Sequence, residues 1–136
     1  MKNKLIHILQ SLDIIYDEKR VKLKNAGMSG YYIDVKKALG DPLALRLMAQ
    51  ELYKGFDRSA TCVAAAGYGG ISLATVISEK YRLHLVLVRD SEKKHGKGGF
   101  IDGYFPNKND LIEVVDDVSS TGGSLRGYCY FNVTFI

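Results

Sequence analysis

The sequence predicts an α/β protein with an open, mainly parallel sheet, flanking helices and a small amino-terminal helix and hairpin appendage. From Thr61 the chain alternates short apolar runs with a helical pattern, which is typical of parallel strands joined by crossovers. The predicted strands cover 61–66, 83–88 and 111–115, and a predicted helix over 71–81 separates the first two. A parallel sheet would bring the turns after these strands to one edge, where such folds bind ligands.

The amino-terminal part is predicted to form a helix followed by a hairpin. Apolar residues at helical spacing predict the helix over about 2–15. Two short apolar runs, 21–24 and 31–35, flank the turn-prone segment 25–30. This composition is typical of a β-hairpin that joins the two runs.

Four further elements are predicted between the hairpin and the third strand. Asp41 followed by proline predicts a capped helix that ends near Gly55. The glycine-rich residues 67–70 predict a tight turn after the first strand. Residues 89–99 predict a charged loop, and residues 100–105 predict an extended segment.

Length and composition indicate one globular domain. The chain has 136 residues, of which 46% are hydrophobic and 25% charged. We expect one domain over 1–136, with a hood over 1–40 and an α/β core over 41–136. No apolar run approaches the roughly 20 residues that span a bilayer, and no signal peptide is evident, so we expect a cytoplasmic protein with no membrane partner.

The cysteine spacing argues against a metal site, and the net charge favours anionic partners. Cys62 and Cys129 lack metal-type spacing, so we interpret both as free structural thiols. The formal net charge of +4 suits nucleic acid or small anionic substrates. Because the basic residues are scattered apart from one loop, we expect small anionic molecules and no nucleic acid as partners.

The segment 111–124 carries the most informative pattern. An apolar strand ends at Asp116 and Asp117, whose carboxylates can accept hydrogen bonds from vicinal hydroxyls. The glycines that follow let backbone N–H groups converge, and a helix beginning at Thr121 would point its positive end to the same place. This combination predicts a site for a sugar phosphate such as ribose 5-phosphate, and the alternative is a tight turn without a ligand. The predicted phosphate-binding residues are Ser119, Ser120, Thr121, Gly122, Gly123 and Ser124.

The charged loop is a second candidate site. Its cations lie between glycines, and mobile loops of this kind close over active sites and exclude water. Arg89, Lys93 and His95 could neutralise a pyrophosphate leaving group, and His95 could also transfer a proton. The alternative is a solvated surface loop.

The glycine-rich turn over 67–70, with Asp90 some way downstream, is similar to a dinucleotide-binding fingerprint. Ser72 stands where that fingerprint has a third glycine or an alanine. We therefore interpret the segment as a turn whose backbone N–H groups, at Tyr68 and Gly69, face pyrophosphate. A nicotinamide-dependent dehydrogenase domain is the alternative.

The segment 111–124 resembles the phosphoribosyl-pyrophosphate (PRPP) signature of type I phosphoribosyltransferases. Three further segments narrow the resemblance to the orotate phosphoribosyltransferase family. Residues 23–34 are similar to the family's Leu-Lys-Ser-Gly-x-x-Ser-Pro-Tyr-Phe segment, and the loop ending at 93–99 is similar to its Arg-Lys-x-x-Lys-x-His-Gly-x-Gly-Gly loop. Residues 68–71 fall on the family's pyrophosphate turn, and the resemblance covers roughly 5–125.

The resemblance implies transfer of a phosphoribosyl group from PRPP to orotate, giving orotidine 5'-monophosphate and pyrophosphate in pyrimidine nucleotide biosynthesis. It also implies a homodimer whose mobile loop reaches the neighbouring subunit's site, and Mg²⁺ held through pyrophosphate and ribose hydroxyls without a direct protein ligand. The implied catalytic residues are Lys93, His95, Arg89 and Asp117. The implied PRPP-binding residues are Asp116, Asp117, the residues 118–124, Tyr68 and Gly69, and the implied orotate-binding residues are Lys24, Tyr32, Ile33 and Ser120.

The chain departs from the family pattern in the loop, the turn and the tail. Asp90 and Gly69 stand where many members have lysine, which removes positive charge beside pyrophosphate. Beyond the signature, the family continues with a helix, further strands and an orotate-binding arginine, whereas this chain has an apolar tail over 128–136. We expect a shortened or frame-shifted gene. These departures favour the alternative of a non-catalytic member of the fold that senses PRPP.

Overall fold

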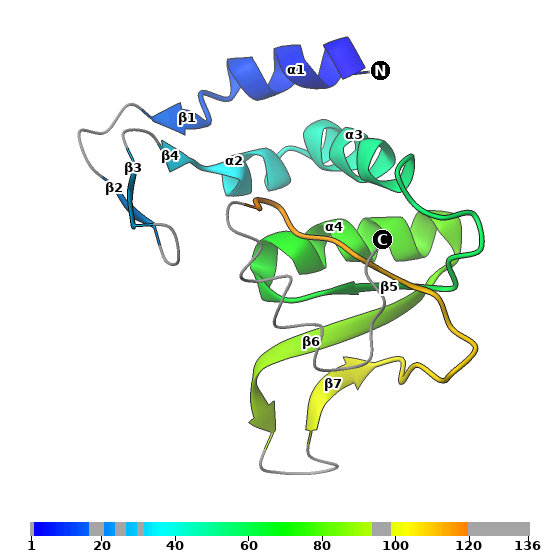
Figure 1. Ribbon diagram of the computed structural model, residues 1–136. Coiled ribbons are helices and arrows are strands. Elements are labelled where there is room, and N and C mark those ends of the chain that lie inside the picture. Colours follow the sequence, from blue (N-terminus) through cyan, green and yellow to red (C-terminus); the bar gives the residue numbers. More distant parts are fainter. Residues whose placement is uncertain (1, 17–20, 24–26, 30–31, 94–98, 120–136) are drawn as a thin grey trace.

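The computed structural model describes residues 2–16, 21–23, 27–29, 32–93 and 99–119. In Figure 1 an α/β core lies beneath a layer of amino-terminal elements. The core comprises α3 (Pro42–Tyr53), β5 (Cys62–Ala65), α4 (Gly67–Tyr81), β6 (His84–Lys93), β7 (Gly99–Gly103) and β8 (Ile112–Val114). The amino-terminal elements are α1 (Lys2–Ser11), β1 (Ile15–Tyr16), β2 (Val21–Leu23), β3 (Gly27–Ser29), β4 (Tyr32–Ile33) and α2 (Val35–Leu39).

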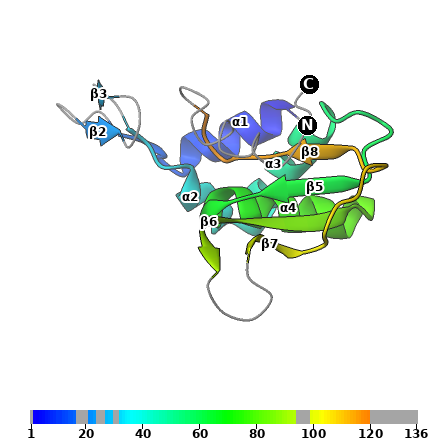
Figure 2. The same ribbon diagram turned by 60° about the horizontal axis from the view of Figure 1, so that its bottom comes forward.

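The core sheet is mainly parallel, as the sequence predicts. Its strand order is β7-β6-β5-β8, and β5 pairs in parallel with both β6 and β8. Figure 2 shows β8, β5 and β6 side by side. Only β7 runs antiparallel, beside β6. The carboxyl ends of β5 and β8 therefore lie at the same edge of the sheet.

Alternating residues of β5 build two apolar layers. Val63 and Ala65 pack with the α4 residues Leu73 and Ile77 in the larger cluster, and α3 adds the buried Ala49. Because successive side chains of a strand point to opposite faces, the neighbouring β5 residues pack in a second cluster. That second cluster contains Cys62, Ala64 and Val86, with Tyr104 and Ile112 packed against it.

Cys62 behaves as the structural thiol that the sequence predicts. It is free and fully buried on the face of the sheet opposite α4. Burial raises the pKa of its thiol, which disfavours the reactive thiolate. Cys129 lies outside the described residues.

The amino-terminal helix is shorter than predicted. It ends at Ser11, and Asp13 adopts a left-handed backbone conformation with φ of 49°. Ile15, predicted as the last helical residue, instead pairs with Ile33 in the short ladder of β1 and β4. The helix prediction over 2–15 is wrong for its last turn, because pairing with a distant strand competes with continuation of the helix.

The predicted hairpin has a different pairing. β2 pairs with β3, with Val21 opposite Ser29, rather than with the run over 31–35. Joining neighbouring segments closes a shorter loop at a lower entropic cost. The described part of the run over 31–35 is divided, because Tyr32 and Ile33 form β4 and Val35 begins α2. Between them, Asp34 N donates to Ile14 O at 2.7 Å and extends the β1–β4 ladder.

Two predicted loops belong to regular elements. The turn over 67–70 is the first turn of α4, and its left-handed residue is Gly67, with φ of 67°. The charged loop is shorter than 89–99, because β6 continues to Lys93 and pairs there with Gly99 of β7. β7 lies within the predicted extended segment, except for its first residue. Pairing with β7 thus outweighs the loop-like composition of residues 89–93.

In the described part of the chain, no helix combines the length and apolar character needed to cross a membrane.

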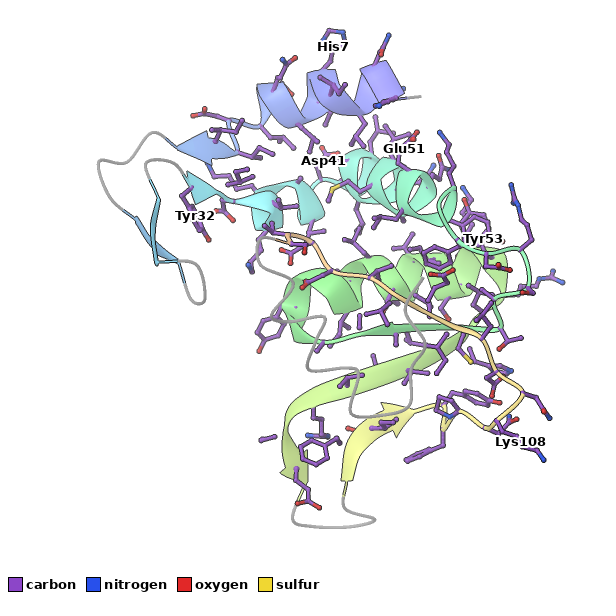
Figure 3. All side chains as sticks on the ribbon, in the orientation of Figure 1. His7, Tyr32, Asp41, Glu51, Tyr53 and Lys108 are labelled. Carbon is purple, nitrogen blue, oxygen red and sulfur yellow. The ribbon has the colours of Figure 1, made fainter. Side chains whose placement is uncertain are left out.

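The cap of α3 agrees with the sequence and gives a test of the fold. Asp41, labelled in Figure 3, accepts hydrogen bonds from Leu43 N at 2.9 Å and Ala44 N at 2.7 Å. We predict that Asp41→Ala lowers the free energy of unfolding by about 1 kcal/mol and the Tm by a few degrees. Asp41→Asn, which keeps an acceptor oxygen, should stay close to wild type in thermal unfolding. Equal losses in both variants would contradict the capping role.

Candidate functional site

The acid pair lies where the ends of β5 and β8 meet the first turn of α4. Val115 continues β8, because its N–H donates to Ala64 O on β5 at 3.0 Å, and its side chain is buried. Asp116 and Asp117 follow directly. The structure therefore brings the end of the predicted signature strand next to the start of the helix that follows β5.

Two glycines of α4 permit this approach. A Cβ on Gly69 would overlap the carboxylate of Asp117. A Cβ on Gly70 would lie 2.9 Å from Val115 O. The sequence interpretation assigns Gly69 a backbone role toward pyrophosphate, and the structure adds that the missing side chain leaves the space that Asp117 occupies.

Asp117 is enclosed and paired with one described cation. Its side chain is 12% exposed, and Oδ2 lies 3.7 Å from Nζ of Lys36 on α2. The same oxygen is buried and accepts no hydrogen bond from any described residue. The Asp117 carboxylate also lies beside the first turn of α4, at the positive end of the helix dipole. Among the described residues, Oδ2 is therefore an enclosed acceptor that lacks a hydrogen-bond donor.

Asp116 is held in a different way. Its Oδ1 accepts a hydrogen bond from Asp117 N at 2.9 Å. Burial and the hydrogen bond with the Asp117 side chain raise the pKa of Asp116, while the charge of Lys36 acts in the opposite direction. Ionising both neighbouring acids in the free protein therefore costs free energy.

Sequence reasoning missed Lys36. The residue lies outside every candidate motif, and its partner follows a strand near the other end of the described chain. The predicted hairpin placed residues up to Val35 in a strand, and so gave no reason to expect a helix that turns Lys36 toward the acids.

The structure gathers part of the predicted PRPP site. Tyr68, which is 89% exposed, shares the first turn of α4 with Gly69, and Val118 and Ser119 follow the acids as exposed residues. The remaining predicted phosphate-binding residues lie outside the described residues and stay predictions: Ser120, Thr121, Gly122, Gly123 and Ser124.

Arg89 has a partner on the neighbouring strand. Both its Nε and its terminal nitrogen contact the Asp102 carboxylate on β7, so its charge is neutralised within the sheet. Lys93 ends β6, whereas His95 lies outside the described residues. The roles of all three cations at pyrophosphate stay predictions.

The predicted orotate contacts are described in part. Tyr32 and Ile33 form β4, and Figure 3 shows Tyr32 on the amino-terminal appendage. Ile33 is 37% exposed. Lys24 and Ser120 lie outside the described residues, so this group also stays a prediction.

The contact between Gly69 and Asp117 gives a test of the site geometry. Alanine normally stabilises a helix relative to glycine by about 1 kcal/mol. Here we predict that Gly69→Ala destabilises the protein by about 1–3 kcal/mol, because the new methyl group displaces the carboxylate.

The control is the same change in an Asp117→Ala background, where the methyl group has room and should stabilise the protein. Urea unfolding of the four proteins in this cycle measures the coupling. Additive effects would contradict the packing described here.

Comparison with known proteins places this geometry in a family. No family model matches the chain. The orotate phosphoribosyltransferase of Methanothermobacter thermautotrophicus is 31% identical over 125 residues, which cover 92% of this chain and 68% of the relative. That of Pyrococcus horikoshii is 33% identical over 132 residues, with the same two coverages. The chain thus spans about two thirds of the length of these relatives.

Solved structures agree on the fold. The orotate phosphoribosyltransferase of Aeropyrum pernix superposes with a TM-score of 0.75 at 22% identity, covering 96% of this chain and 75% of that one. The Mycobacterium tuberculosis orotate phosphoribosyltransferase in complex with PRPP has a TM-score of 0.66 at 23% identity, covering 93% and 70%. Sequence identity above 30% over two thirds of the relatives, together with this fold, shows that the chain belongs to the orotate phosphoribosyltransferase family.

Proposed function

We propose that the protein transfers the phosphoribosyl group of PRPP to orotate, giving orotidine 5'-monophosphate and pyrophosphate, a reaction of pyrimidine nucleotide biosynthesis. The acid pair after β8, packed against the first turn of α4, is the observation that carries this proposal. The names of the curated relatives support the same reaction.

The chemistry requires an anion near the sugar. Breaking the bond between the anomeric carbon and pyrophosphate leaves positive charge on the ribose ring and negative charge on the leaving group. We propose that Asp117 stabilises the ribose charge, since an enclosed carboxylate is weakly screened by water. Its Oδ2 has no hydrogen-bond donor in the described structure and can accept a ribose hydroxyl, and Asp116 offers a second acceptor.

The two phosphate ends of PRPP would be bound by different segments. We propose that residues 119–124 hold the 5-phosphate, and that Arg89, Lys93 and His95 neutralise pyrophosphate. Arg89 would then have to exchange Asp102 for the leaving group. That exchange costs little, because ion pairs exposed to solvent contribute only about 0–1 kcal/mol.

Magnesium fits this site as a companion of the substrate. The described residues contain no group of three or more His, Cys, Asp or Glu that could hold a metal ion. We propose, from the family resemblance, that Mg²⁺ is held through pyrophosphate and ribose hydroxyls, and it would neutralise charge on the leaving group when bound. We also propose, from the family resemblance, a cytoplasmic homodimer with small-molecule partners and no nucleic acid or membrane partner.

A second candidate function is PRPP sensing without turnover. Two observations favour it. The carboxylate of Asp117 fills the space beside Gly69, where many family members carry a lysine, and Arg89 is neutralised by Asp102. Both reduce the positive charge available to the leaving group.

Turnover distinguishes the two functions. The purified chain is incubated with PRPP, Mg²⁺ and orotate, and release of pyrophosphate is followed with and without orotate. We predict orotate-dependent release, and a loss of about 10- to 100-fold in kcat/KM for Asp117→Asn, which removes a charged acceptor. Binding of PRPP without release would establish the sensor. Binding of neither substrate would contradict both functions.

The raised pKa of Asp116 predicts that replacing this acid increases the stability of the protein and weakens PRPP binding. The pKa of Asp116 is raised in the folded state above its ordinary value of 3.8. Protonated Asp116 therefore adds to the free energy of unfolding, and this contribution is complete below pH 3.8. It is lost as the pH rises through the folded pKa. Asp116→Asn removes this loss, so we predict a variant more stable than wild type at pH 7 and about 10-fold weaker in PRPP binding.

Urea unfolding at pH 4 and pH 7 and calorimetric PRPP titration measure these two effects. Asp13→Asn, which neutralises an exposed carboxylate outside the acid pair, is the control. A less stable Asp116→Asn protein with unchanged PRPP affinity would count against both the buried position of this acid and its contact with ribose.

A further inference from the structure

We propose that Lys36 is a positioning residue that fixes the Asp117 carboxylate and links the segment carrying the predicted orotate contacts to the acids that face ribose. This inference rests on the proposed function and adds a residue to it that belongs to none of the predicted motifs.

The first support is the position of Lys36. It is the second residue of α2, and its Nζ lies 3.7 Å from Oδ2 of Asp117. Within the described residues, no other cation lies in ion-pair distance of this carboxylate. The lysine is 60% exposed while the acid is 12% exposed, so the lysine reaches inward from the surface to an enclosed anion.

The second support is the packing of the carboxylate against α4. Gly69 lies against it so closely that no Cβ fits there. Asp117 is thus restrained by the backbone of α4 and attracted by the charge of Lys36. Removing the lysine would leave the packing against α4 as the remaining one of these two restraints.

The third support is the positive charge that Lys36 places beside two neighbouring carboxylates. Two adjacent carboxylates repel each other and tend to share a proton, which would remove one acceptor and one negative charge. The described titratable groups on the elements packed against the pair are Lys36 and Lys37 on α2, Tyr68, Glu79, Lys80 and Tyr81 on α4, Cys62 on β5 and Glu113 on β8. Of these described groups, Lys36 is the cation within ion-pair distance of Asp117, and its charge lowers the pKa of Asp116 against the effect of burial.

The fourth support is the closeness of Lys36 to the predicted orotate contacts along the chain. β4, which carries Tyr32 and Ile33, leads through Asp34 directly into α2. Lys36 therefore follows the predicted orotate contacts by a few residues and touches a ribose-facing acid. A displacement of β4 on binding of the acceptor would move the cation that fixes Asp117.

The neighbouring lysine provides a matched control. Lys37 shares the same short helix, but its Nζ donates to Asp13 O at 3.3 Å, away from the acids. Lys37→Gln removes the same charge from the same element without removing the contact to Asp117.

The experiment compares Lys36→Gln, Lys36→Arg and Lys37→Gln with wild type. We expect Lys36→Gln to lower kcat/KM for PRPP about 3- to 10-fold and to move the acid limb of its pH profile up by about half a unit. Lys36→Arg should restore most of both, and Lys37→Gln should change neither. Unchanged PRPP kinetics and an unchanged acid limb in a folded Lys36→Gln protein would overturn the proposal.

A second readout does not depend on turnover. The carboxyl carbons of Asp116 and Asp117 are titrated by NMR in wild type and in Lys36→Gln, with Lys37→Gln as the control. We expect the acid pair to titrate at higher pH only when Lys36 is replaced, and coincident titrations would refute the role of Lys36. If wild type releases no pyrophosphate, the proposed reaction fails while this titration still decides whether Lys36 holds the acids.

Discussion

The contact between the end of β8 and the first turn of α4 determines the rest of the site. The parallel order of β8 and β5 sets the two strand ends side by side, and Gly67 turns the chain directly from β5 into α4. Gly69 and Gly70 then allow the backbone after β8 to lie against the helix. If either position carried a side chain, Asp117 would have to leave the place where its carboxylate meets both Lys36 and the positive end of α4.

The predictable parts of the molecule depend on local sequence. The apolar runs that become β5 and β8, and Asp41 before a proline, carry their signals within a few residues. The pairing of Ile15 with Ile33 and the extension of β6 past Arg89 depend on partners that a local pattern cannot reveal. The same reason hid Lys36, because its partner becomes a neighbour only after the sheet has formed. The acid pair was found because both acids follow one strand.

The electrostatic state of the acids follows from this packing. An acid that stabilises a ribose cation must be ionised, yet burial and a neighbouring acid both favour the protonated form of Asp116. The nearest described counterion comes from the amino-terminal part rather than from the core. The α/β core thus supplies the anions, and α2 supplies the cation whose charge opposes the effect of burial on Asp116. In the proposed reaction the amino-terminal elements would therefore contribute to the site together with the core.

Arg89, the proposed cation at pyrophosphate, shows the opposite arrangement. Asp117 is enclosed, and its Oδ2 accepts no hydrogen bond from the described part of the chain, whereas Arg89 lies at the surface and is already paired with Asp102. An enclosed anion keeps its full interaction with a developing charge, because water screens it poorly. A surface pair contributes little and is easily exchanged. In the proposed reaction Asp117 would therefore be in place before substrate arrives, whereas Arg89 would have to leave Asp102 to reach pyrophosphate. We expect turnover to depend more on Asp117 than on Arg89 for this reason.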